Sequence, residues 1–184
     1  MKIIFAVLLV LVEAGLLNSD ATGFSHKMPD TTPKISGPDS AINPIDSLLK
    51  QFNVDNARRP RVALAIVRSS RTHNVDARLI ASILIIESRG NPFAISRSDA
   101  VGIMQIHVPT WARTVDEEGI NLFKIEDNID FGARILKKYV EQYGRDEGIK
   151  RYNGWIAGDS ESEQNAEAYF QRVQRVYLSS LHVR

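Results

Sequence analysis

One glutamate, Glu87, lies where an apolar helical run meets a polar loop. Four apolar residues, Ile83 to Ile86, precede it directly, so its carboxyl group lies at the end of a stripe that must pack inside. Burial disfavours the charged form of a carboxyl group and raises its pKa, which is the change that a general acid needs near neutral pH. The pattern therefore favours acid–base chemistry at Glu87.

The residues that follow Glu87 are typical of a ligand-binding loop. Gly90, Asn91 and Pro92 end the helix, and a segment rich in Ser, Gly and Asp continues to an apolar turn around Gln105. An isolated Glu at a helix end ordinarily faces solvent, but loops of this kind place backbone donors and acceptors around a ligand. The amide of Gln105 has two interpretations, a buried structural hydrogen bond or a contact to substrate.

Other chemistries are poorly supported. The four histidines are scattered along the chain, at His26, His73, His107 and His182, and the sequence contains no HExxH motif and no cysteine. It also contains no G-x-S-x-G motif and no Gly-rich phosphate loop. We therefore predict neither a metal site nor a cofactor.

The composition is that of a globular protein, with 43% apolar and 24% charged residues among 184. Without residues 1–21 the chain has 22 basic and 20 acidic side chains, a weak balance that predicts no binding of nucleic acid. Because cysteine is absent, no disulfide can stabilise the fold. The packing of the core must therefore stabilise the fold without covalent cross-links.

The N-terminus has the pattern of a secretory signal peptide. Lys2 precedes the apolar run Ile3 to Val12, which is too short to span a bilayer, and Ala21 suits cleavage before Thr22. An uncleaved anchor is the alternative. We predict a signal peptide over residues 1–21 and a periplasmic or secreted location, followed by a disordered tether over 22–44 that is poor in large apolar groups.

Residues 45–184 are expected to form one all-α domain, because apolar residues recur there at helical spacing and no run alternates long enough for a strand. The central helix carries Glu87, begins at a cap provided by Asn74 or Asp76, and ends at Gly90. The other expected helices cover about 45–52, a stretch after Pro60, 108–115, a segment capped by Asp127 or Asn128 and stopped at Gly144, 146–152, and a last helix with a capping box of Ser160 and Glu163.

Several motifs along the chain occur together in one known family. They are Glu87-Ser88, Asn91-Pro92 with Ala94 and Ser96, Ala100 with Gly102 and Met104-Gln105-Ile106, Pro109-Thr110, Asn128-Ile129 with Gly132, Tyr152-Asn153-Gly154, and Tyr169. In this order they resemble the ES…NPxAxS…GAxGLMQIxPxT signature and the downstream blocks of the SLT-type lytic transglycosylases. The resemblance covers about residues 62 to 177.

This resemblance implies a goose-lysozyme-like helical fold that acts on peptidoglycan. The family cleaves the β-1,4 bond between N-acetylmuramic acid and N-acetylglucosamine and leaves 1,6-anhydro ends. Glu87 matches the catalytic Glu of the family, which acts first as acid and then as base. The implied partner is the glycan strand, with a cell-wall-spanning secretion, conjugation or phage machine as a further possible partner, and the protein is expected to be a monomer.

By the same resemblance, six further residues would line the saccharide groove or position the substrate acetamido group: Ser96, Met104, Gln105, Tyr152, Asn153 and Tyr169. For Tyr152 a core position with a satisfied hydroxyl is an equal alternative. The chain departs from the family pattern at three positions, with Asp99 and Trp155 where Gly is usual and Arg151 where Ala is usual. The first bears on the shape of the loop and the other two on a subsite.

No second catalytic carboxylate can be assigned from the sequence. Asp99, Asp116, Asp127 and Asp130 all lie in polar or cap-like positions. Substrate-assisted chemistry removes the need for one, since the 2-acetamido oxygen of the sugar can stabilise the developing cation. The alternatives are a hydrolytic, lysozyme-like muramidase of the same fold and a non-catalytic glycan-binding module.

Overall fold

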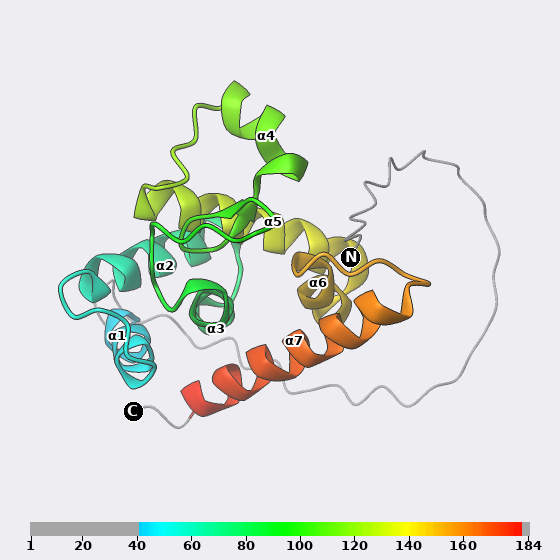
Figure 1. Cartoon of the computed structure of the whole chain (residues 1–184). Coiled ribbons are helices and arrows are strands. Elements are labelled where there is room, and N and C mark those ends of the chain that lie inside the picture. The colour runs from blue at the N-terminus through cyan, green and yellow to red at the C-terminus, as the bar shows by residue number, and fades with distance from the viewer. Residues whose placement is uncertain (1–40, 182–184) are drawn as a thin grey trace. The chain divides into compact units, whose positions relative to one another are not determined.

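The computed structural model describes residues 41–181, so the predicted signal peptide and nearly all of the predicted tether lie outside the described residues. The described part contains seven helices and one pair of two-residue strands (Figure 1). The expectation of an all-α domain is confirmed, with the strands as an addition. The elements are α1 Ile42–Gln51, α2 Arg59–His73, α3 Ala77–Ser88, β1 Ala100–Val101, β2 Ile106–His107, α4 Val108–Glu117, α5 Ile125–Tyr143, α6 Arg145–Tyr152 and α7 Ser160–Ser180.

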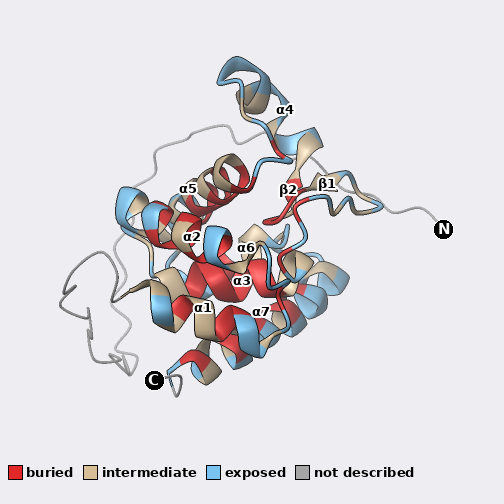
Figure 2. Ribbon diagram, turned by 90° about the vertical axis from the view of Figure 1, so that its left-hand side faces the viewer, coloured by how far each residue is buried: buried red, intermediate tan, exposed pale blue. Residues whose placement is uncertain are grey.

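Helix α3 is the central element. It packs against α1, α2 and α7, and every residue from Leu79 to Ile85 is buried (Figure 2). The helix begins at a cap of Asp76, whose side chain accepts a hydrogen bond of 2.8 Å from the N–H of Arg78. Of the two cap candidates in the sequence, Asp76 is therefore correct. An apolar helix held on several sides gives its last turn a fixed position.

Helix α5 packs against α2 and α6, and its start corrects a prediction. It begins at Ile125 after Lys124, so neither Asp127 nor Asn128 is its cap. The side chain of Asn128 is fully buried and bonds to distant loop residues instead of to its own helix. The predicted end at Gly144 is confirmed.

The starts of α7 and α1 also differ from expectation. Asp159 caps α7 by accepting a hydrogen bond of 3.2 Å from the N–H of Glu161, so the predicted capping box of Ser160 and Glu163 is wrong. Asp159, one residue earlier, performs that role. Helix α1 begins at Ile42, so the last residues assigned to the tether form its first turn.

The two strands lie in the long segment between α3 and α4. They pair antiparallel, with Ala100 opposite His107 and Val101 opposite Ile106. Strands of two residues are too short to show a period-two pattern, which explains why the sequence did not predict them. Helix α4 follows directly, has Pro109 in its first turn and contains no fully buried residue. No helix within residues 41–181 is long and apolar enough to cross a membrane.

Candidate active site

Glu87 lies in the last turn of α3, where the apolar helix reaches the surface loop. The helix ends at Ser88. Arg89, the next residue, is left-handed with φ 52°, and Gly90 continues in the same region with φ 78°. A glycine is required at position 90 because a Cβ there would lie 2.6 Å from a methyl group of Val54. Glu87 itself is half-buried. The carboxyl group of Glu87 therefore lies at the end of an apolar helix and is still partly accessible to solvent.

The hydroxyl of Tyr169, on α7, donates a hydrogen bond of 2.7 Å to Oε1 of Glu87. Burial raises the pKa of Glu87 from 4.5 to about 7, although the Tyr169 hydrogen bond and the charge of Arg172 both act to lower it. Desolvation is the larger effect. Near neutral pH the carboxyl group is thus divided between its protonated and ionised forms, as an acid that later acts as a base requires.

Tyr169 is only 1% exposed and lies behind Glu87. Burial and the charge of Glu87 raise the pKa of its phenol well above the usual value, so the hydroxyl stays protonated and remains a donor. The resemblance predicted a glycan contact for this residue. Such a contact stays a prediction, while the observed contact is with the Glu87 carboxylate.

Tyr152, at the end of α6, contacts the loop rather than open solvent. Its hydroxyl donates a hydrogen bond of 2.9 Å to the carbonyl of Met104, and the charge of Glu87 is among the causes that raise the pKa of its phenol. Met104 is fully buried. Gly132 of α5 permits this approach, because a Cβ there would lie 2.8 Å from the Met104 side chain and 3.0 Å from the Tyr152 hydroxyl. The hydroxyl of Tyr152 is thus satisfied, while its contact with substrate stays a prediction.

Ser96 and Gln105 shape the loop itself. The Oγ of Ser96 accepts hydrogen bonds from the N–H groups of Ser98 and Ala100, at 3.2 Å and 2.9 Å. The side-chain amide of Gln105 donates to the carbonyls of Ala94 and Gly102, at 3.1 Å and 3.0 Å. The amide of Gln105 thus makes structural hydrogen bonds, while its contact with substrate stays a prediction.

The loop is joined directly to the residue after the candidate acid. Ser88 donates from its Oγ to the carbonyl of Ile103 at 2.7 Å and accepts from the N–H of Gly90 at 3.1 Å. Asp99 adopts a left-handed φ of 59° at the position where the family usually has Gly. Asp tolerates this conformation better than most residues, so the substitution keeps the turn.

Asn128 is a site residue whose role the sequence did not show. Its Oδ1 accepts from the N–H of Met104 at 2.8 Å, and its Nδ2 donates to the carbonyls of Val101 and Leu122, at 3.0 Å and 2.9 Å. Gly102 must lack a side chain, because a Cβ there would collide with the Asn128 amide and the Leu122 carbonyl. Asn128 therefore ties two loops to α5. The motif Asn128-Ile129 with Gly132 was the available signal.

Asn153 is exposed beyond the end of α6, and no contact places it against Glu87, so its predicted role stays untested. Arg151 and Trp155, which differ from the family pattern on either side of Asn153, pack together. The guanidinium of Arg151 lies 4.0 Å from the ring centroid of Tyr143 and 4.9 Å from that of Trp155. These side chains thus form one stacked group next to the Tyr152-Asn153 segment.

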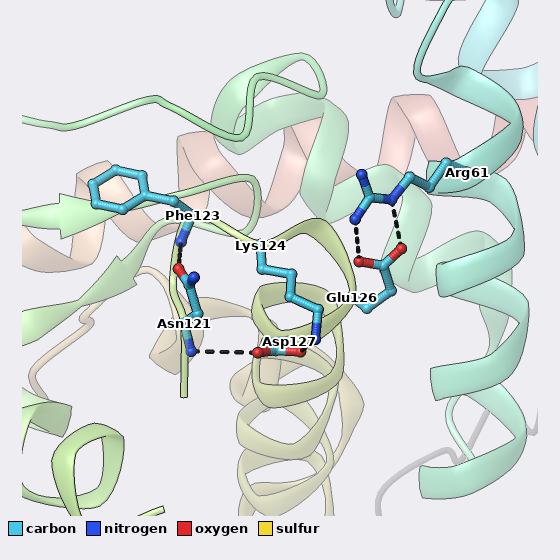
Figure 3. A network of polar contacts seen from close by, with 6 residues as sticks. All are labelled: Arg61, Asn121, Phe123, Lys124, Glu126 and Asp127. Atoms are coloured by element: carbon cyan, nitrogen blue, oxygen red, sulfur yellow. Dashed lines mark hydrogen bonds and ion pairs between the residues drawn. The ribbon is translucent and has the colours of Figure 1, made fainter. Parts of the chain in front are cut away.

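Two of the aspartates considered from the sequence contact other side chains. Asp127 accepts from the Nζ of Lys124 at 2.7 Å (Figure 3), and Asp130 lies 2.8 Å from Nε2 of His73. Within residues 41–181, the groups that shift the pKa of Glu87 are a tyrosine and an arginine, and neither is a carboxylate. The same residues contain no cluster of His, Asp and Glu suited to a metal ion.

Comparison with known proteins gives one family and several relatives. The family described as "Transglycosylase SLT domain" matches residues 65–173. The chain is 36% identical over 95 residues to the membrane-bound lytic murein transglycosylase C of Photorhabdus laumondii, a match that covers 47% of this chain and 27% of the relative. It is 39% identical over 77 residues to the protein of the same name from Edwardsiella ictaluri, covering 38% and 21%. The match thus spans about a quarter of the length of these relatives.

Proposed function

Since this chain belongs to the transglycosylase SLT domain family, we propose that it cleaves peptidoglycan glycan strands as a lytic transglycosylase. The bond cleaved is the β-1,4 bond between N-acetylmuramic acid and N-acetylglucosamine, and the product carries a 1,6-anhydro ring. The observation that carries the proposal is Glu87, a half-buried acid with a pKa of about 7, fixed by a hydrogen bond of 2.7 Å from Tyr169.

In the first step, protonated Glu87 gives its proton to the glycosidic oxygen as the bond to C1 of the muramyl sugar breaks. The acetamido oxygen of that sugar stabilises the positive charge that develops at C1. The Tyr169 hydroxyl then stabilises the carboxylate that Glu87 has become, because it donates to the ionised oxygen. In the second step the Glu87 carboxylate takes the proton of the C6 hydroxyl while the C6 oxygen bonds to C1. This closes the 1,6-anhydro ring and restores the protonated acid.

This scheme uses one carboxyl group, which agrees with the surroundings of Glu87. A hydrolytic muramidase would need water activated at the opposite face, commonly by a second carboxylate. Asp127 and Asp130 are engaged with Lys124 and His73 instead. A non-catalytic glycan-binding module would gain little from an acid whose pKa burial has raised.

We also propose that the protein acts outside the inner membrane, where peptidoglycan lies. The support is the signal-peptide pattern of residues 1–21, with Lys2 before an apolar run. The glycan strand is the proposed partner.

The proposal is tested by replacing the acid with its amide. Glu87→Gln keeps the shape of the side chain but has no proton to give, so the rate of sacculus clearance should fall at least ~100-fold. Glu163→Gln, at an exposed glutamate of α7, is the matched control and should clear sacculi like the parent. A folded Glu87→Gln protein with a rate within a few-fold of the parent would show that another group is the acid.

A further inference from the structure

Two aromatic rings lie exposed and side by side on the loops beside the candidate site. Phe93 is 69% exposed and Phe123 is 45% exposed. Their ring centroids are 6.4 Å apart and their planes differ by 28°, so the rings are nearly parallel. Contiguous exposed apolar groups of this kind commonly mark a binding surface. We call Phe93 and Phe123 the aromatic pair.

The two loops present their rings in the same way. The Oδ1 of Asn91 accepts a hydrogen bond of 3.0 Å from the N–H of Phe93, and the Oδ1 of Asn121 accepts one of 3.0 Å from the N–H of Phe123. In each loop the residue between the Asn and the Phe, Pro92 or Leu122, is buried. Both turns thus anchor an apolar residue inside and direct a ring outward.

The loop that carries Phe123 is fastened to the start of α5 (Figure 3). Asp127 accepts hydrogen bonds from the N–H of Asn121, at 3.4 Å, and from the Nζ of Lys124, at 2.7 Å. Glu126, the neighbouring residue of α5, accepts two hydrogen bonds from the guanidinium of Arg61 of α2, at 2.6 Å and 2.7 Å. Phe123 therefore projects from a backbone that is fastened to α5, and α5 is in turn paired with α2.

The aromatic pair is continuous with the loop of the candidate acid. Asn128 bonds to the carbonyls of Val101 and Leu122, which joins the two loops, and the Gly102 N–H donates to the Ala94 carbonyl at 2.8 Å. Phe93 follows Glu87 by six residues, so their Cα atoms are at most roughly 20 Å apart. A strand of several sugars that has one bond at Glu87 can reach the pair.

We propose that Phe93 and Phe123 form a stacking subsite for a sugar of the glycan strand away from the bond that is cleaved. This inference rests on the proposed function. Pyranose rings expose faces of C–H groups, and these lie flat against aromatic rings, which offer a large rigid apolar surface. Two aromatic side chains cover roughly 300–500 Å² when fully buried, and these partly exposed rings offer less, which suits one or two sugars and falls short of the ~800 Å² per partner of a standard protein interface.

The test measures equilibrium binding of two probes, long peptide-free peptidoglycan strands and a tetrasaccharide of the same repeat. In these binding measurements every protein, the reference parent included, carries Glu87→Gln, so that no probe is cleaved. Phe93→Ala and Phe123→Ala should each weaken binding of the long strands about tenfold, because each removes one stacking face. The affinity for the tetrasaccharide, which fills only the positions next to Glu87, should stay within twofold of the parent. Phe93→Tyr keeps the ring and should bind both probes like the parent.

Two controls separate the loss of a stacking ring from the loss of any exposed apolar side chain. Leu181→Ala removes an apolar side chain that is 50% exposed at the end of α7 and should change neither affinity. Phe93→Leu keeps apolar volume without a flat face and should weaken long-strand binding as Phe93→Ala does. Both positions of the aromatic pair are exposed, so the variants should fold, which circular dichroism checks.

Equal long-strand affinity of the parent and the folded alanine variants would overturn the subsite. So would variants that keep this affinity but lose binding to vesicles of phosphatidylethanolamine and phosphatidylglycerol, since the rings would then serve a lipid surface. Failure of the proposed function looks different, because the parent itself would then not cleave sacculi. A parent that cleaves, with alanine variants that bind long strands unchanged, would contradict the subsite alone.

Discussion

At the scale of single residues, two opposing effects set the pKa of Glu87. Burial in an apolar surrounding raises it, while the Tyr169 hydrogen bond and the charge of Arg172 lower it. Burial dominates and brings the pKa to about 7. Removing the burial should therefore lower the pKa of Glu87, and removing the Tyr169 or Arg172 contact should raise it. The pH dependence of the rate should follow in the same direction.

Tyr169→Phe should shift the alkaline limb of the rate profile to higher pH. The hydroxyl stabilises the ionised carboxylate, so its loss raises the pKa of Glu87 further and keeps the acid protonated at higher pH. The maximal rate should fall roughly 10- to 100-fold, because the carboxyl group is no longer held in place. Rates of sacculus clearance across pH measure both effects. A limb that stays in place, or moves to lower pH, would mean that the hydrogen bond does not govern this pKa.

Glu87→Gln should also stabilise the fold above neutral pH. The folded protein holds the Glu87 proton up to about pH 7, whereas in the unfolded chain the ordinary pKa is 4.5. Raising the pH through this window therefore lowers the free energy of unfolding of the parent, and Gln, which does not titrate, escapes this loss. The advantage should be absent near about pH 4 and grow to at most about 3 kcal/mol by about pH 8, less where solvent reaches the half-buried group. Urea unfolding at both pH values measures the difference in free energy of unfolding between Glu87→Gln and the parent. A difference that is the same at both pH values would contradict this prediction.

At the scale of elements, the loop between α3 and α4 depends on a side chain from α5. Asn128→Ala would leave the Met104 N–H and two carbonyls without their partners in a buried place. We expect the free energy of unfolding to fall by about 2 to 4 kcal/mol and the cleavage rate to fall with it. Asn165→Ala, at an exposed asparagine of α7, is the control for urea unfolding. A loss no larger than that of the control would show that the loop holds its shape without Asn128.

The elements show what a sequence can and cannot predict. The sequence predicts the apolar run of α3 and limits its cap to Asn74 or Asp76, because both signals are local. Local preference makes Asn128 a cap candidate beside Asp127, because asparagine favours caps, but the partners of Asn128 lie as far as 27 residues away in the chain. The same limit applies to Tyr169, which is separated from Glu87 by 82 residues. A motif can point to such residues, but the contacts that each one makes are tertiary and do not follow from its neighbours in the sequence.

At the scale of the whole molecule, the candidate site draws on elements far apart in the sequence. Glu87 comes from α3, Tyr152 from α6 and Tyr169 from α7, while α5 supplies Asn128 and Gly132. The chain contains no cysteine, so packing, hydrogen bonds and ion pairs such as that of Arg61 with Glu126 hold these elements together without a disulfide. The proposed role of Glu87 requires that all of these elements be in place. We therefore expect catalytic activity and the cooperative fold to be lost together.

The chemical form of the product tests the central claim most directly. With one acid at Glu87 and a substrate acetamido group that assists, the muramyl C6 hydroxyl should capture C1 within the same sugar. Well-oriented intramolecular reactions reach effective concentrations of ~10⁵ M or more, far above that of water itself. Mass spectrometry of muropeptides released from purified sacculi should then find products lighter by one water than those of a lysozyme digest, and borohydride should not reduce them. Predominantly hydrated, reducible ends would contradict the transglycosylase and identify a hydrolase of the same fold.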